Sequence, residues 1–137
     1  MKRRKRSSRR LALGLCAGAA LACAEHVSRG DLAARIARGD APVIVDVRSE
    51  AEYREARVPG AVHVPFHALY ARREQLPDAG GEPLVLYCEH GPRAGIARAQ
   101  LWLAGIGPVR FLEGHMSAWK ADGLPVASGA GGDQPRR

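Results

Sequence analysis

One cysteine, Cys88, lies outside the first 24 residues of the chain. It ends the apolar run 83–87 and is followed by the polar turn EHGPR, residues 89–93. Apolar residues at helical spacing come next. A thiolate is a strong nucleophile, and a cysteine that served only as a small core residue would not require such a polar turn. The pattern therefore predicts a reactive cysteine where a buried strand meets a helix.

The turn after Cys88 can bind an anion through its backbone. Gly91 permits a positive φ, Pro92 suits the first turn of a helix, and the N-terminus of that helix adds a positive partial charge. Successive N–H groups in such a turn form an anion-binding nest, which favours the thiolate. Arg93 adds a fixed positive charge for a bound anion. The predicted substrate-binding residues, which supply the backbone donors, are Glu89, His90, Gly91, Arg93 and Ala94.

Cys88 has two alternative roles. A buried cysteine can act as a small hydrophobe in a core strand. A metal site could combine Cys88 with His90 and His115, but a Cys-x-His spacing is poor for zinc and no further cysteine follows. We therefore expect no metal and no cofactor.

The positive charge of the chain is confined to its beginning. The formal net charge is +7, and residues 1–24 hold seven of the 21 basic residues and none of the 14 acidic ones. The remainder is neutral, with 14 basic residues against 14 acidic ones. A neutral domain has no electrostatic footprint for a phosphate backbone, so a nucleic-acid partner is not expected.

Residues 1–24 have the layout of a secretory signal peptide, with a basic stretch, a short apolar run and small-residue cleavage sites. The apolar run 11–24 is shorter than the roughly 20 residues that a membrane-spanning helix needs. An uncleaved anchor and a lipid anchor at Cys23 are the alternatives. We expect a periplasmic or secreted protein with no membrane contact after cleavage. Cys88 would then be its only cysteine, and no internal disulfide could form.

Strand and helix patterns alternate along the rest of the chain. Helices are expected at 29–39, 49–56, 67–76, 94–105 and 116–123, and strands at 43–47, 61–64, 83–88 and 108–114. Ser49 and Glu52 have the spacing of a capping box. The alternation predicts an α/β fold with a parallel β-sheet flanked by helices on both faces. Ligands bind at the carboxyl ends of strands in such sheets, which is where Cys88 falls.

Three blocks, DVRSEAEYREARVPGAVHVPF, LVLYCEHGPRAGIARAQLWLAGI and VRFLEGHMSAWKADGLPV, resemble the successive blocks of a rhodanese-like sulfurtransferase domain. The resemblance implies a rhodanese-like three-layer fold over residues 25–127. The composition of residues 128–137, SGAGGDQPRR, predicts a disordered tail. It implies that Cys88 carries sulfur as a persulfide, that residues 89–94 form its cradle and that Arg93 closes the loop. Asp46 and Arg48 match a largely structural Asp-x-Arg motif. A monomer is expected.

The sequence departs from the family pattern at Arg57 and at His115, which replaces a glycine. Neither is expected to touch the cysteine loop. His115 is expected in a surface turn, and a position at the mouth of the pocket is the alternative. Trp102 and Trp119 are expected in the core, on apolar helix faces. His63 and His67 are expected to be structural.

The predicted function is a thiosulfate sulfurtransferase in which Cys88 accepts a sulfane sulfur from a thiosulfate-like donor and passes it to cyanide or a thiol. A non-catalytic partner-binding or sensing module of the same family is one alternative. A cysteine-dependent phosphatase or arsenate reductase is another. That class places five residues between its cysteine and arginine, and here four separate Cys88 from Arg93.

Overall fold

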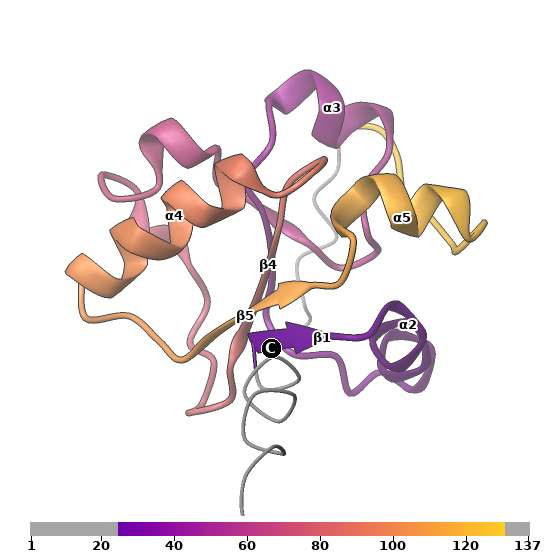
Figure 1. Cartoon of the computed structure of the whole chain (residues 1–137), viewed down its shortest axis with the longest axis horizontal. Helices are drawn as coiled ribbons and strands as arrows, with labels where there is room; N and C mark the ends of the chain where they lie inside the picture. Colours follow the sequence, from indigo (N-terminus) through magenta and orange to yellow (C-terminus); the bar gives the residue numbers. More distant parts are fainter. Residues whose placement is uncertain (1–24, 131–137) are drawn as a thin grey trace, which may run out of the picture.

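A computed structural model describes residues 25–130 as a five-stranded parallel sheet with helices on both sides (Figure 1). The predicted signal peptide and residues 131–137 lie outside the described residues. The elements in chain order are β1 (His26–Val27), α2 (Arg29–Arg38), β2 (Ile44–Asp46), α3 (Glu50–Glu55), β3 (Val62–His63), the 3₁₀ turns η1 (Phe66–Ala68) and η2 (Arg73–Gln75), β4 (Leu84–Tyr87), α4 (Pro92–Leu103), β5 (Val109–Leu112) and α5 (His115–Ala121).

The strand order β1-β5-β4-β2-β3 puts β4 at the centre of the sheet. All four pairings are parallel, and β4 lies between β2 and β5. Every residue of β2 and β4 is buried, as expected for strands covered on both faces. The predicted fold class is therefore confirmed. Cys88, the residue after β4, lies at the carboxyl edge of the sheet beside the end of β2.

Two apolar layers enclose the sheet. On one face, side chains of α2, α3 and α5 pack on strand residues that include Val85 and Tyr87. On the other face, α4 and the segment around η1 pack on the alternate residues Leu84, Leu86 and Cys88. In Figure 1, α4 lies on one side of the sheet and α2 and α5 lie on the other. This alternation follows from the period of two in a strand.

Capping residues define both ends of α2 and the start of α3, where the sequence predicts a capping box. The Ser28 hydroxyl accepts from the Asp31 amide at the start of α2, and Gly39 ends this helix with φ 76°. At α3 both halves of the capping box form: the Ser49 side chain accepts from the Glu52 amide, and the Glu52 carboxylate accepts from the Ser49 amide.

The helix expected over residues 67–76 is wrong, because two short 3₁₀ turns stand in its place. A continuous helix would pair the Tyr70 amide with the Phe66 carbonyl. The Gln100 side chain of α4 takes both groups, accepting from Tyr70 at 3.0 Å and donating to Phe66 at 2.8 Å. A contact from a distant helix thus replaces the local hydrogen bond.

The core assignment is right for Trp119 and wrong for Trp102. Trp119 is fully buried, whereas 77% of Trp102 is exposed. The buried residues of α4 are Ala94, Ala97 and Leu101, and Trp102 lies about 100° further around the helix. It therefore faces away from the sheet.

At both ends of residues 25–130 the structure forms contacts that the sequence did not predict. The two-residue strand β1, which the sequence did not predict, pairs with β5. Gly129 lies within the expected tail, yet its amide donates to the Arg54 carbonyl and its carbonyl accepts from Arg57. Between residues 25 and 130, none of the helices is both long enough and apolar enough to cross a membrane.

Candidate functional site

Cys88 is placed where the central strand turns into α4. Its side chain is buried, with 1% of the residue exposed, and the Gly91 amide donates a hydrogen bond to its Sγ at 3.0 Å. Gly91 has φ 123°, in a region that residues with a side chain rarely adopt. The sulfur is thus held inside a turn that requires glycine.

The start of α4 lies beneath this turn. The helix begins at Pro92, so the amides of Arg93 and Ala94 belong to its first turn, where N–H groups have no acceptor within the helix. The amides of Glu89, His90, Gly91, Arg93 and Ala94 were the predicted donors, and the structure directs the Gly91 amide to the sulfur. The other four belong to the same short segment of the chain.

The Glu89 side chain is turned to cations outside the loop. Its carboxylate binds Lys120 Nζ at 2.7 Å and Arg48 Nη1 at 3.1 Å. Partial burial opposes ionisation, but the hydrogen bonds from Lys120 and Arg48 outweigh it and lower the pKa of Glu89. Glu89 thus contributes its backbone to the loop, while its charge is neutralised nearby.

Arg48 joins the loop to the interior of the sheet. Its guanidinium, which is 2% exposed, donates to the buried Asp46 carboxylate and to the Ala56 carbonyl. Burial alone would lower the pKa of Arg48, but the hydrogen bonds and charge of Asp46 raise it. Tyr87 donates to the same carboxylate at 2.7 Å. Asp46 and Arg48 thus have the structural role that the resemblance implied, and Arg48 also anchors Glu89.

Arg93 forms a bidentate ion pair with Glu52, with distances of 2.7 and 2.8 Å. This bond raises the pKa of Arg93 and lowers that of Glu52. The sequence predicted Glu52 only as a helix cap and Arg93 as a ligand for bound anions. The structure instead engages the Arg93 guanidinium with α3, which ties the loop to that helix. Nothing local in the sequence links these two residues.

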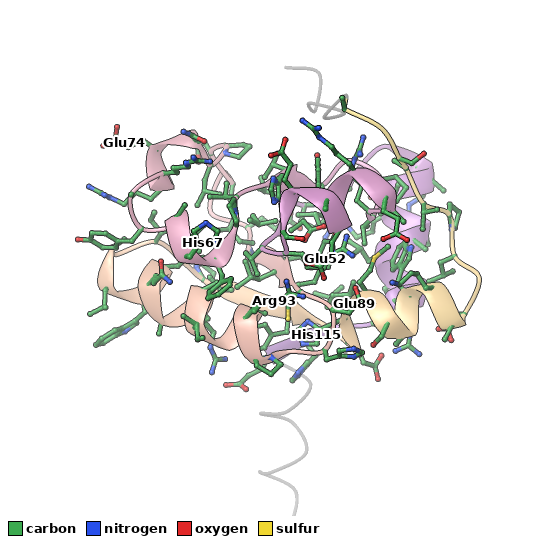
Figure 2. The ribbon with its side chains drawn as sticks, turned by 90° about the horizontal axis from the view of Figure 1, so that it is seen from above. Glu52, His67, Glu74, Glu89, Arg93 and His115 are labelled. Carbon is green, nitrogen blue, oxygen red and sulfur yellow. The ribbon has the colours of Figure 1, made fainter. Side chains whose placement is uncertain are left out.

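His115 was expected in a surface turn away from the cysteine loop, and that expectation is wrong. Its half-buried imidazole accepts the Cys88 amide hydrogen at Nδ1, with an N–N distance of 3.3 Å. Burial lowers its pKa, and the charges of His26 and His90 lower it further. Figure 2 shows His115, Glu89, Arg93 and Glu52 gathered together, with His67 and Glu74 lying apart from them.

The other histidines and the departure at Arg57 have separate surroundings. His63 stacks on Tyr53 and hydrogen bonds to the Arg48 carbonyl, which fits the expected structural role. His90 and His67 are exposed.

Arg57 is buried and lies over the Tyr53 ring. Among residues 25–130, no three His, Cys, Asp or Glu side chains are grouped to hold a metal ion.

A groove of about 520 Å³ lies elsewhere, between α4 and the segment that precedes β5. Its lining includes Arg98, Trp102 and Pro108 but no nucleophile.

Comparisons with known proteins identify the family of this chain. The family model of the rhodanese-like domain matches residues 28–122. A sulfurtransferase of Allochromatium vinosum is 33% identical over 106 residues, covering 77% of this chain and 97% of that protein. An uncharacterized protein of Synechocystis is 40% identical over 87 residues, covering 64% of this chain and 48% of that protein, so this chain matches only about half the length of that relative.

A solved structure from Rhodopseudomonas palustris, described as a protein of unknown function and possible tyrosine phosphatase, has a TM-score of 0.63. It is 26% identical, and the match covers 88% of this chain and 99% of that one. The fold, the position of Cys88 and the match over residues 28–122 together show that this chain belongs to the rhodanese-like domain family.

Proposed function

We propose that the protein is a sulfurtransferase in which Cys88 takes up a sulfane sulfur as a persulfide and delivers it to a thiophilic acceptor. The observation that carries the proposal is the Gly91 amide bound to Cys88 Sγ at 3.0 Å, at the junction of β4 and α4. A backbone donor on the sulfur stabilises the attacking thiolate. The persulfide carries its charge on the outer sulfur, one bond further out, and the remaining loop amides are the proposed donors to it. The sulfurtransferase among the relatives supports the same activity.

Thiosulfate is the proposed type of donor. The Cys88 thiolate attacks its sulfane sulfur, the sulfur–sulfur bond of thiosulfate breaks, and sulfite leaves with the electron pair. Cys88 then holds the persulfide. Cyanide or a thiolate attacks the outer sulfur, which departs with the acceptor and regenerates the Cys88 thiolate. No oxidant or cofactor enters either step.

The loop amides stabilise the charge during both steps. Those of Arg93 and Ala94, at the start of α4, can face the sulfonate oxygens of the donor. Only 1% of Cys88 is exposed, so residues that cover the loop must shift for the donor to reach Sγ.

The experiment that tests the proposal is an intact-mass measurement of the full chain before and after incubation with thiosulfate. We expect the mass of one sulfur atom to be added and then removed by cyanide with formation of thiocyanate. Cys88→Ser should abolish both events, whereas Cys23→Ser, the matched control, should retain them. A chain that gains no sulfur, or that gains it equally in Cys88→Ser, would refute the proposal.

Phosphatase or arsenate reductase chemistry is the second candidate, because the Rhodopseudomonas palustris structure is described as a possible tyrosine phosphatase. Four residues between Cys88 and Arg93 make a small cradle for a tetrahedral phosphoryl or arsenate centre. The bidentate bond to Glu52 also keeps Arg93 from a bound oxyanion. We expect negligible hydrolysis of aryl phosphates. Hydrolysis faster than sulfur transfer by the unmodified chain would reverse this assignment.

A non-catalytic partner-binding or sensing module is the remaining alternative. It predicts that Cys88 takes up sulfur without turnover when cyanide or a thiol is supplied. Steady-state formation of thiocyanate from thiosulfate distinguishes an enzyme from such a module.

We also propose export to the periplasm or the medium as a monomer. The basic stretch and the apolar run 11–24 support export. Mass spectrometry of the protein isolated from cell fractions tests it and identifies both the cleavage site and any lipid on Cys23. A full-length chain in the cytosol would contradict export, and size-exclusion chromatography with light scattering tests the monomer.

A further inference from the structure

The first residues of α5 form hydrogen bonds with the backbone of Cys88 and of the residue after it. The Met116 amide donates to the Cys88 carbonyl at 3.0 Å, and the Ser117 amide donates to the Glu89 carbonyl at 3.2 Å. The third contact runs the other way, from the Cys88 amide to His115 Nδ1 at 3.3 Å. Because β5 ends at Leu112, these contacts support the chain beyond the end of the strand that pairs with β4.

His115 adopts an unusual backbone conformation to make its contact. Its φ is 54°, and no other non-glycine residue between 25 and 130 has a positive φ. Histidine is among the few residue types that enter this left-handed region, and such a conformation persists only where the surroundings hold it. It lies directly after Gly114, which itself has φ 65°.

The ring of His115 also lies against the turn that contains Gly91. Its Nε2 is 3.2 Å from the position that a Cβ on Gly91 would occupy. Gly91 is the residue whose amide binds Cys88 Sγ. One imidazole therefore contacts the backbone that carries the thiol and packs beside the backbone that stabilises it.

We propose that His115 is a positioning residue for Cys88, acting as a neutral imidazole that accepts the Cys88 amide hydrogen and packs beneath Gly91. The inference rests on the sulfur-transfer role proposed for Cys88. Since Nδ1 accepts, the proton of the neutral ring is on Nε2. A protonated ring carries hydrogens on both nitrogens and cannot accept from Cys88.

The surroundings of the ring favour its neutral form. Burial and the charges of His26 and His90 lower the pKa of His115. The ring also lies near Phe111, over which the Arg98 guanidinium sits. The carboxylates of the neighbouring elements are engaged with cations: Glu52 with Arg93, Glu89 with Arg48 and Lys120, and Glu113 and Asp122 with Arg29.

Two substitutions at His115 separate its hydrogen bond from its backbone strain. His115→Asn keeps an acceptor and tolerates a positive φ, but does not titrate. His115→Gly relieves the strain and removes the acceptor. His67→Asn, on the exposed turn η1, is the matched control. The direct measurement is amide hydrogen exchange of Cys88 by NMR, expressed as protection relative to the intrinsic exchange rate at each pH.

We expect protection of the Cys88 amide to fall about fivefold in His115→Gly, the equivalent of ~1 kcal/mol for one neutral hydrogen bond. His115→Asn should restore it. In the wild type, protection should fall as the pH drops through the titration of the His115 ring, followed by its own imidazole resonances. In His115→Asn it should not. Equal protection in the wild type and His115→Gly, or a neutral ring with its proton on Nδ1, would overturn the proposal.

Sulfur loading of Cys88 from thiosulfate is the functional measurement. Its maximal rate should fall by up to about fivefold in His115→Gly, because without the hydrogen bond Cys88 is held in the reactive position for a smaller fraction of the time. The rate should recover in His115→Asn, and unfolding curves show whether all variants are folded. A wild type that takes up no sulfur would refute the proposed function, while the exchange and imidazole measurements would still decide the role of His115.

Discussion

The three tyrosines form an internal series for testing the hydrogen-bond network behind Cys88. The Tyr87 hydroxyl donates to the Asp46 carboxylate at 2.7 Å and accepts from the Val58 amide at 3.1 Å. The Tyr53 hydroxyl donates to the Ala61 carbonyl at 2.7 Å. Tyr70 is 49% exposed. Replacing each with Phe removes one oxygen from three very different environments.

Tyr87→Phe should cost the most stability. It removes a hydrogen bond to a buried charge, and it leaves the fully buried Val58 amide without its acceptor. A bond to a charged group contributes about 1.5–3 kcal/mol and an unsatisfied buried donor costs about 1–3 kcal/mol. Because Arg48 still pairs with the Asp46 carboxylate, we expect a loss of about 2–4 kcal/mol in the free energy of unfolding.

Tyr53→Phe and Tyr70→Phe are the references for the loss of stability in Tyr87→Phe. Tyr53→Phe removes one bond between neutral groups and should cost about 0.5–1.5 kcal/mol. Tyr70→Phe should lie within about 0.5 kcal/mol of the wild type. Equilibrium unfolding in urea with an unchanged m-value gives the three losses. If Tyr87→Phe cost no more than Tyr70→Phe, the buried network would not stabilise the sheet as argued.

The same variants test how the free energy of unfolding depends on pH. Burial and the Asp46 carboxylate raise the pKa of Tyr87 well above its ordinary value of 10.0. At pH values above 10.0 the unfolded chain releases the phenol proton, whereas the folded chain retains it up to its higher pKa. Between these two pKa values the free energy of unfolding therefore falls as the pH rises, by up to ~1.4 kcal/mol per pH unit. Tyr87→Phe should lose this component of the alkaline destabilisation. An identical alkaline slope in the wild type and the variant would contradict the assignment.

Three further substitutions follow from single contacts, and each is measured by unfolding. Gly114→Ala would place a Cβ 2.5 Å from the Ala118 Cβ at φ 65°, and should cost about 1–3 kcal/mol; a neutral result would contradict this packing. Gly95→Ala lies inside α4 with nothing within 4 Å of the new Cβ, and should stabilise by about 0.5–1 kcal/mol; a loss would mean that the position is crowded. Glu52→Gln breaks the bidentate bond to Arg93, and should cost about 1–2 kcal/mol at neutral pH, since solvent screens this partly exposed pair. Because Arg93 lowers the pKa of Glu52, this deficit should shrink as the pH falls below the ordinary glutamate value of 4.5, and a constant deficit would refute the charge argument.

Much of the site's framework could be predicted from local patterns. The β-branched run before Asp46 and the apolar run before Cys88 are strands of the sheet. Ser49 and Glu52 form the predicted capping box. These signals are readable because side-chain periodicity and helix caps depend on residues a few positions apart. The placement of Cys88 at the carboxyl edge follows from the parallel alternation of strands and helices.

The errors arise where a distant element overrides a local preference. Gln100 takes the backbone groups that a helix over 67–76 would have paired. Trp102 has the apolar character of a core residue, but α4 meets the sheet through a stripe of smaller side chains. Neither outcome can be read from a window of neighbouring residues, because each depends on which face of α4 packs inward.

The sequence by itself determined the fold class, the position of the thiol and the glycine-dependent turn around it, since each rests on neighbouring residues. Only the tertiary structure decided the partners of the loop. Glu52 binds Arg93 from 41 positions away, and His115 lies beneath Cys88 from 27 positions away. Such contacts depend on how α3 and α5 dock at the carboxyl edge of the sheet, and docking is set by the packing of the whole core.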